Sequence, residues 1–139
     1  MTMETIIVRV EWCEKNFGAT FSENVPGAVV FTASRVQDLK RIAKETLDFH
    51  IKGMIEDGDK VPQWLLNGDY QFQFVFCDVA SLLQSCSDMV PLVSISRATG
   101  INPHQLSHYA NGIKKPRPAQ RQRIIEGLHK IGRELLTVE

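Results

Sequence analysis

Residues 93–112, VSISRATGINPHQLSHYANG, carry the strongest structural signal in the chain. Gly100 interrupts a helical pattern, and glycine readily adopts the positive φ angle that a tight turn requires. Asn102 is a favourable N-cap for a following helix, and Pro103 suits its first position, where no backbone N–H is needed. The stretch therefore predicts two short helices joined by a tight turn at Gly100.

The residues around this turn also predict how the two helices pack. Ser96 and Ala98 are small, so a crossing helix can approach the first helix closely there. Four apolar or aromatic residues have the spacing to fill the core between the helices, namely Ile95, Ile101, Leu106 and Tyr109. A turn glycine, a capped second helix and apolar positions behind it are the features of a helix-turn-helix.

The second predicted helix has an outward face of polar side chains that can hydrogen-bond base edges in the major groove. This candidate base-reading set is His104, Gln105, Ser107 and His108. Cations that can contact phosphates follow the helix; they are Lys114, Lys115, Arg117 and Arg121. The alternatives are exposed histidines without a role and a solvated basic loop. We expect a surface that binds duplex DNA.

Residues 94–118, which end in NGIKKPRP, resemble the helix-turn-helix of the Cro/C1 (XRE-type) repressors. The resemblance implies that the start of the second helix reads bases and that Asn111 contacts a phosphate. The family often opens its first helix with a glutamine, whereas this chain has Leu92, so we do not expect a phosphate contact at that position.

A last helix is expected to begin after Pro116 or Pro118 and to run to about Leu136. Its apolar residues recur at coiled-coil-like spacing, and they are Ile124, Leu128, Ile131 and Leu135. This stripe either packs on the other helices of the same domain or serves a dimer, because the half-sites of such repressors normally demand one. We expect a homo-oligomer, either a dimer or a tetramer.

The N-terminal part predicts a small sheet followed by a helix. Residues 6–10, 17–22 and 28–32 predict the three strands of an antiparallel meander. Ser34 and Gln37 form a capping-box pattern that places a helix start at Ser34. The expected buried face of this helix consists of Leu39, Ala43, Leu47, Ile51 and Met54. Asp57-Gly58 is expected to end the helix.

Residues 61–64 predict a short extended link, and residues 69–77 alternate in the manner of a fourth strand. Its aromatic face is expected to pack on the long helix, although such a face can also stack nucleic-acid bases. The aromatic residues are Tyr70, Phe72, Phe74 and Phe76. Asp78 is a good N-cap for a helix over residues 79–86. The predicted boundary between domains 1–77 and 78–139 lies here.

The net charge of zero is the sum of two opposite parts. Residues 1–89 contain 8 Lys and Arg against 13 Asp and Glu, a net charge of −5, and residues 90–139 contain 8 against 3, a net charge of +5. The asymmetry favours nucleic-acid contact by the basic part. The acidic part would repel phosphates and is compatible with a basic partner.

The front domain resembles the HicB antitoxin family. The resemblance rests on its three strands, helix and strand, on the helix from Ser34, and on the segments GATFS at 18–22, VPGAV at 25–29 and IEDGDKVP at 55–62. It implies a β-β-β-α-β domain similar to a degraded RNase H fold without catalytic residues. It also implies that this domain covers the active site of a small basic mRNA-cleaving toxin of HicA type. The second strand lacks the Tyr-Tyr pair of many HicB proteins, and Glu23-Asn24 departs from the usual approach to Pro26.

We thus expect an α+β chain in which a HicB-like domain precedes an all-α helix-turn-helix domain. The expected function is that of a DNA-binding antitoxin of a type II toxin–antitoxin system that represses its own operon. The alternative is a stand-alone transcriptional regulator whose front domain oligomerises or binds a ligand. Cys13 and His50 are the candidates for an enzyme, but their spacing indicates no dyad, so no catalytic residue is expected.

The three cysteines, Cys13, Cys77 and Cys86, are expected to be small buried side chains. Their odd count argues against a disulfide framework, and no cysteine or histidine pair has the spacing of a structural zinc site. We expect no metal and no cofactor. No apolar run is long enough for a membrane span and no signal peptide is visible, so we expect a cytoplasmic protein without a membrane partner.

Overall fold

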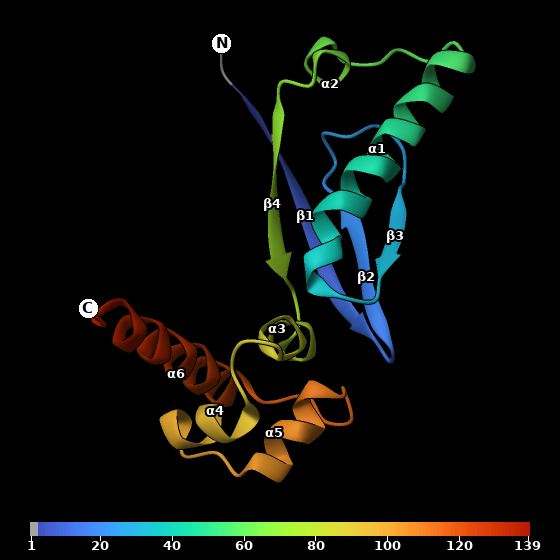
Figure 1. Cartoon of the computed structure of the whole chain (residues 1–139). Coiled ribbons are helices and arrows are strands. Elements are labelled where there is room, and N and C mark those ends of the chain that lie inside the picture. The colour runs from blue at the N-terminus through green and yellow to red at the C-terminus, as the bar shows by residue number, and fades with distance from the viewer. Residues whose placement is uncertain (1–2) are drawn as a thin grey trace. The chain divides into compact units, whose positions relative to one another are not determined.

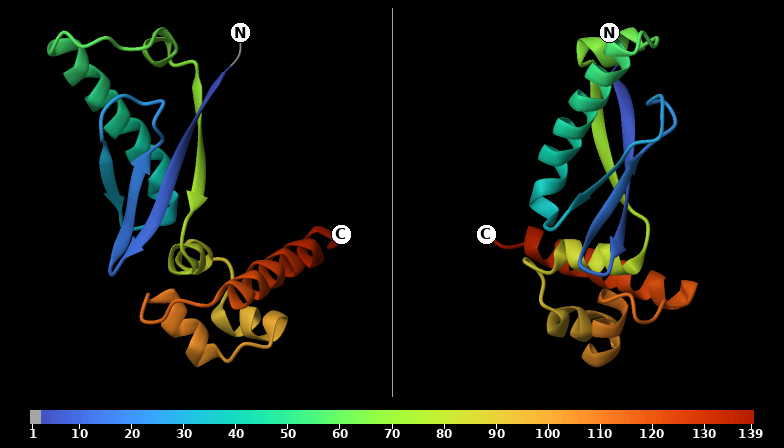
Figure 2. Two further views of the ribbon diagram at one scale, coloured as in Figure 1. Left: turned by 180° about the vertical axis from the view of Figure 1, so that it is seen from behind. Right: turned by 90° about the vertical axis from the view of Figure 1, so that its right-hand side faces the viewer.

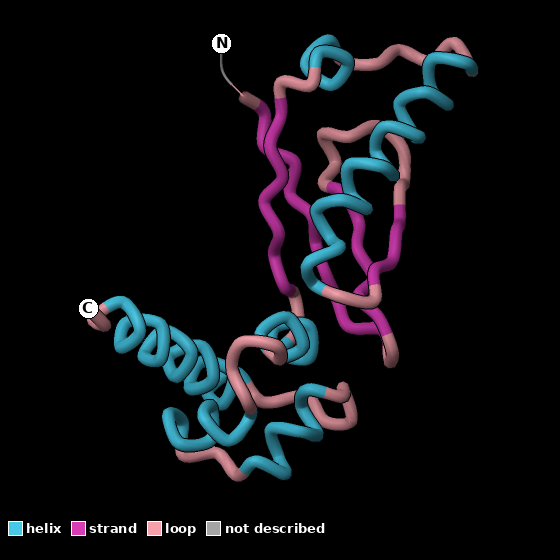
Figure 3. Tube along the Cα trace, in the orientation of Figure 1, coloured by secondary structure: helices cyan, strands magenta, loops and turns pink. Residues whose placement is uncertain are grey.

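The computed structural model describes residues 3–139, which form an α+β protein (Figures 1 and 3). The chain divides into two compact units, of which the first ends at Cys77 and the second is Asp78–Glu139. The first unit contains β1 (Glu4–Cys13), β2 (Asn16–Phe21), β3 (Val30–Ala33), the 3₁₀ helix η1 (Val36–Asp38), α1 (Leu39–Glu56), α2 (Gln63–Asn67) and β4 (Tyr70–Phe76). The second contains α3 (Val79–Cys86), α4 (Leu92–Thr99), α5 (Pro103–Ala110) and α6 (Pro118–Leu136).

The sheet of the first unit has the strand order β3-β2-β1-β4. The first three strands form the predicted antiparallel meander, and β4 pairs with β1 in parallel. The third strand begins at Val30, two residues later than predicted. Its ladder starts with Val30 opposite Thr20, and β2 ends one residue beyond Thr20, so Ala28 has no strand residue to face.

One face of the sheet packs against α1, which lies over it in Figures 1 and 2. Along β1, Val8 and Val10 are buried and the alternate Arg9 and Glu11 are exposed. The core under α1 contains Val8, Val10, Phe17, Ala19, Phe31, Ala33, Leu39 and Ala43. The predicted buried face of the helix is confirmed at four positions, whereas Ile51 is only half-buried.

The start of this helix differs from the prediction. Arg35 has extended backbone, η1 follows it, and α1 begins only at Leu39. Neither helix start has a side-chain capping hydrogen bond, so the predicted capping box of Ser34 and Gln37 is wrong. The end is confirmed, since α1 stops at Glu56 and Gly58 has a φ angle of 76°.

The predicted extended link at residues 61–64 holds at Pro62, whose backbone is extended, and is wrong from Gln63, where α2 begins. Pro62 is the N-cap of this helix and Gly68 ends it with a φ angle of 75°. Leu65 is buried in a cluster with Ile6 and Leu47. This five-residue helix therefore closes the end of the core near the start of β4.

The cysteines are not buried as predicted. Cys13 and Cys77 are exposed, Cys86 is half-buried, and all three are free thiols. Cys13 follows the same side of β1 as Arg9 and Glu11, which is the side without α1. Alternation along the strand, rather than the general tendency of cysteine to be buried, sets its exposure.

The four helices of the second unit share one core. The Asp78 carboxylate accepts a hydrogen bond from the Ser81 amide at 2.8 Å, which confirms the predicted N-cap of α3. The core residues are Val79, Leu83, Ile95, Ile101, Leu106, Tyr109, Ala110 and Ile124. Along α6, Leu128 and Ile131 are half-buried against this core, and Leu135 is 65% exposed. The predicted stripe thus packs within its own unit except at its last position.

In the part of the chain that the structure describes, no helix combines the length and the apolar character needed to cross a membrane.

Candidate nucleic-acid interface

The turn between α4 and α5 is built as the sequence predicts. Gly100 ends α4 in the left-handed conformation with a φ angle of 76°. The Asn102 side chain accepts a hydrogen bond from the His104 amide at 2.8 Å, and Pro103 occupies the first turn of α5. Asn102 thereby satisfies one of the amides that a helix start leaves unpaired.

Buried side chains fix α5 from behind. The four predicted core residues are confirmed, since Ile95, Ile101, Leu106 and Tyr109 are at most 5% exposed. Helix α6 packs tightly against α4 at Gly127, where an added Cβ would lie 2.4 Å from Thr99 Cγ2. The outward side of α5 is therefore presented on a packed, well-defined support.

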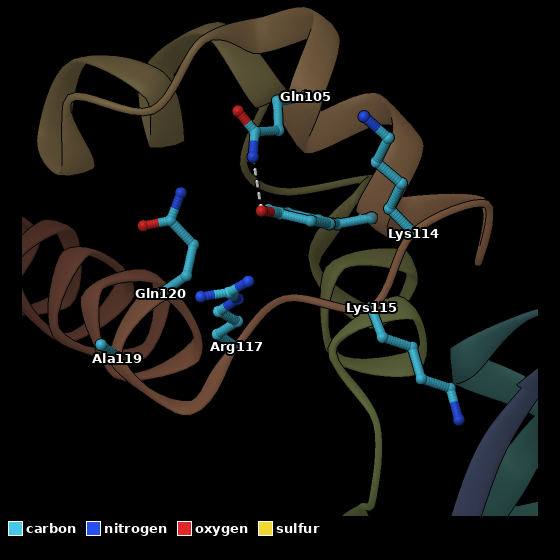
Figure 4. Close-up of a pocket in the computed structure, with 7 residues that line it drawn as sticks. Gln105, Lys114, Lys115, Arg117, Ala119 and Gln120 are labelled. Carbon is cyan, nitrogen blue, oxygen red and sulfur yellow. Dashed lines mark hydrogen bonds between the residues drawn. The ribbon is translucent and has the colours of Figure 1, made fainter.

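The predicted base-reading residues separate into two groups. The His104 and His108 rings lie 4.5 Å apart between centroids, and His104 is exposed while His108 and Ser107 are half-buried. Gln105 lies on a different side of α5, and its amide donates a hydrogen bond to the Tyr109 hydroxyl at 2.6 Å (Figure 4). Only the two histidines and Ser107 thus form a common polar surface.

Asn111, the predicted phosphate ligand, is held at the end of α5. Its Nδ2 atom donates to the Ser107 carbonyl oxygen at 2.9 Å and lies 3.4 Å from Ser107 Oγ. Both contacts are hydrogen bonds within the helix end, so a phosphate oxygen that accepts from Nδ2 would have to replace the longer bond to Ser107 Oγ. The residue is exposed, as such a contact requires.

A pocket of about 660 Å³ lies beside α5 and brings together part of the predicted basic set. Its lining residues are Gln105, Tyr109, Lys114, Lys115, Arg117, Ala119 and Gln120 (Figure 4). Three of these carry positive charge; in Figure 4 the Arg117 guanidinium lies near Gln120, while the ends of Lys114 and Lys115 point away from Tyr109 and from each other, so the two lysines flank the pocket. Arg121 is exposed on α6 and is not among the lining residues.

Arg123 contributes to this region, although the sequence analysis did not single it out. Its guanidinium donates to the Thr99 carbonyl oxygen at 2.7 Å and to Gln120 Oε1 at 2.9 Å. These bonds tie the end of α4 to the first turns of α6. The sequence holds no local signal for this contact, because Thr99 and Arg123 are 24 positions apart.

A second groove lies in the first unit, between α1 and β4. It has a volume of about 690 Å³ and is lined by Lys40, Lys44, Gly68, Tyr70, Gln71, Phe72 and Phe74. Lys44 Nζ donates to the Tyr70 hydroxyl at 2.8 Å and to Asp48 at 2.9 Å. These two hydrogen bonds, of which the one to Tyr70 has the larger effect, raise the pKa of Lys44 above its usual value. The ammonium group therefore stays charged.

The two residues considered as catalytic candidates, His50 and Cys13, contact neighbouring backbone and glycine residues. A ring nitrogen of His50 lies 2.6 Å from the Pro26 carbonyl oxygen, and the ring packs beside Gly27. Cys13 Sγ lies over Gly18, where a Cβ would be 2.8 Å away. Among residues 3–139, no cluster of three or more His, Cys, Asp or Glu side chains has the arrangement to hold a metal ion.

We compared the chain with models of protein families, with curated protein sequences and with solved structures, and none of the three comparisons found a match.

Proposed function

We propose that the second unit binds duplex DNA through a helix-turn-helix made of α4 and α5, with α5 in the major groove. The observation that carries this proposal is the construction of α5. Leu106 and Tyr109 anchor one side in the core, His104 and His108 project from another side, and a cationic pocket that Gln105 and Tyr109 help to line lies beside the same helix. A helix fixed from behind with polar side chains in front matches the way this motif reads base edges.

In this proposal, the base-reading surface consists of His104, Ser107 and His108. Imidazole nitrogens and a hydroxyl can each donate or accept a hydrogen bond, so they suit the mixed donor and acceptor pattern of the major groove. The ring contact at 4.5 Å between the histidines restricts both side chains to one region of the helix face. Gln105, whose amide is engaged by Tyr109, supports the neighbouring pocket instead.

The cationic pocket would hold a backbone phosphate. Lys114, Lys115 and Arg117 supply the charge, and Asn111 and Arg121 would contact phosphates on either side. Such contacts set the position and orientation of the protein on the duplex without reading its sequence. The tie from Arg123 to Thr99 would keep α4 and α6 in place when the DNA binds.

The experiment is a fluorescence-anisotropy titration of the full chain against two labelled duplexes of equal length. One duplex is the segment directly upstream of the coding sequence, and the other has the same composition in scrambled order. We expect tighter binding to the first, because an autorepressor recognises its own operator. Equal affinity for both duplexes would contradict the recognition of an operator. The absence of binding to either duplex would contradict DNA binding altogether.

We further propose that the first unit neutralises a small basic toxin of HicA type and that the complex represses its operon. The three strands, the long helix α1 and the final strand of this unit support this proposal, with the short helices η1 and α2 on either side of α1, and so does the net charge of −5 over residues 1–89. Opposite potentials favour encounter with a basic partner.

The test is purification of the tagged full chain from its own host at low salt, followed by mass identification of bound proteins. A small basic protein in a stoichiometric amount, active in RNA cleavage when separated, is the expected result, and its absence would contradict the toxin.

A second candidate is a stand-alone regulator whose first unit binds a small ligand. The groove between α1 and β4 favours it, because Lys40 and Lys44 lie beside Tyr70, Phe72 and Phe74. Cations beside aromatic rings suit an anionic ligand with an apolar or aromatic body. Native mass spectrometry of the full chain from its own host distinguishes the candidates: a co-purified small molecule that is lost in a Lys40→Glu variant supports the regulator, and a bound protein supports the antitoxin.

A further inference from the structure

Strand β4 forms one edge of the sheet and pairs only with β1 among the described strands (Figure 1). The Asp69 carbonyl oxygen accepts from Glu4, and the Cys77 amide donates to Val10. Residues in a strand direct their backbone groups alternately to one side and the other, so the odd-numbered residues face β1. The amides and carbonyls of Tyr70, Phe72, Phe74 and Phe76 consequently point away from the sheet.

The β4 edge lacks the features that normally prevent an exposed edge strand from pairing with another chain. Proteins protect exposed edges with short strands, charged side chains, prolines or bulges. The opposite edge, β3, has only four residues. By contrast, β4 has seven residues, YQFQFVF, with no charge and no proline, and it pairs with β1 in unbroken register.

We infer that β4 pairs with β4 of a second copy of this chain, antiparallel and about a two-fold axis at Gln73. In this register Tyr70 lies opposite Phe76 and Phe72 lies opposite Phe74. Gln71 then lies opposite Val75, and Gln73 lies opposite its own counterpart. The two four-stranded sheets would join into one sheet of eight strands.

The directions of the backbone hydrogen-bonding groups in β4 allow it to pair with a second copy of itself. In an antiparallel ladder, directly opposed residues exchange both hydrogen bonds only if both have their backbone groups directed at the partner. Even-numbered residues of β4 must therefore face even-numbered residues of the other copy. Of the two-fold registers that satisfy this condition, only the one centred on Gln73 pairs all seven residues.

The side chains agree with the same register. Tyr70, Phe72, Phe74 and Phe76 lie on the α1 side of the sheet and are only half-buried. Pairing would place aromatic rings of the two copies side by side, and cross-strand aromatic pairs stabilise sheets. The opposite face would bring together Gln71, Gln73 and Val75, so no like charges oppose each other. A two-fold contact also closes after two copies, whereas a head-to-tail contact would continue into a filament.

A cysteine cross-link tests the register directly. In a full-length variant with Cys13, Cys77 and Cys86 replaced by serine, Gln73→Cys places two thiols opposite each other at a non-hydrogen-bonded position. The Cα separation there is about 4.5 Å, within the range that a disulfide bridges. Mild oxidation should convert most of this variant into a covalent dimer. The matched control is Gln71→Cys in the same background, which lies opposite Val75 and should stay uncross-linked.

Sedimentation of the full chain provides the second measurement. The wild-type protein should dimerise, and Gln73→Lys should raise the dissociation constant about tenfold or more, because two like charges would face each other across the axis. Gln71→Lys should have a smaller effect, since its lysine would oppose Val75. Wild-type protein that stays monomeric, a dimer that Gln73→Lys leaves intact, or equal cross-linking at both cysteine positions would each overturn the inference. All these readouts are made without DNA, so they are independent of the proposed function.

Discussion

Asn102 and Gly100 have local roles that follow from the chemistry of single residues. The asparagine side chain pairs with an amide at the start of α5, and the glycine reverses the chain after α4. Replacing Asn102 with alanine leaves that amide unpaired, so we expect the free energy of unfolding to fall by about 1 kcal/mol. Urea denaturation measures this, and Asn102→Ser should retain most of the stability because serine also caps. An unchanged midpoint for Asn102→Ala would contradict the capping role.

His104 is the most exposed of the proposed base-reading residues. Its replacement by alanine should change which sequences are preferred, with a loss of about 1 kcal/mol at the base pair it contacts and little change in non-specific affinity. Selection from a random duplex library shows the preference of each variant. His129→Ala, which removes an exposed histidine from α6, should leave the preference unchanged. A uniform loss over all sequences would remove His104 from the base-reading set.

At this scale, most residues whose role depends on their immediate neighbours could be predicted, with the capping box of Ser34 and Gln37 as the exception, and residues that act across the fold could not. Asp78, Gly100 and Asn102 act within three residues of themselves, and their predicted roles are confirmed. Gln105 was grouped with the histidines by its polarity, but its orientation depends on the buried Tyr109 hydroxyl. Arg123 acts across 24 residues, so its contact required the tertiary structure.

The contact between α4 and α6 depends on the absence of a side chain at Gly127. A Cβ there would meet Thr99 Cγ2 at 2.4 Å, and Gly127 is buried. We expect Gly127→Ala to lower the free energy of unfolding by about 1–3 kcal/mol, because the helices must move apart. On the same helix, a Cβ at Gly132 meets nothing within 4 Å. Gly132→Ala should therefore raise stability by up to about 1 kcal/mol. Thermal denaturation of both variants measures the two changes in stability. Equal changes for Gly127→Ala and Gly132→Ala would contradict the special role of Gly127.

Elements with several repeats of an apolar pattern were predictable, and so were the eight-residue helices α3 and α5, whose starts carry a capping residue, but the five-residue helix α2 was not. The period of α1 extends over five turns and that of β4 over seven residues, and both were found. The five residues of α2 span little more than one helical turn, so no apolar pattern can repeat within them, and residues 61–64 were predicted to be extended chain. The start of β3 depends on where β2 leaves the ladder, which no property of residues 28–32 reveals. The parallel pairing of β4 with β1 likewise joins segments more than sixty residues apart.

The whole chain combines an acidic part and a basic part in one neutral molecule. Lys114 and Lys115 are exposed in the basic part and line the pocket beside α5. The central claim is that this region holds DNA phosphates. Binding to duplex DNA should then weaken with salt, because each phosphate contact releases counterions.

The most direct measurement is the salt dependence of duplex affinity for the full chain and for a Lys114→Gln, Lys115→Gln double variant. If both lysines contact phosphates, the slope of log affinity against log salt becomes shallower by about 2, at about 0.9 per contact. A Lys52→Gln, Lys60→Gln variant makes the same change in net charge within the first unit and should keep the wild-type slope. A slope that the first pair leaves unchanged, or that both pairs reduce equally, would contradict DNA binding at this surface.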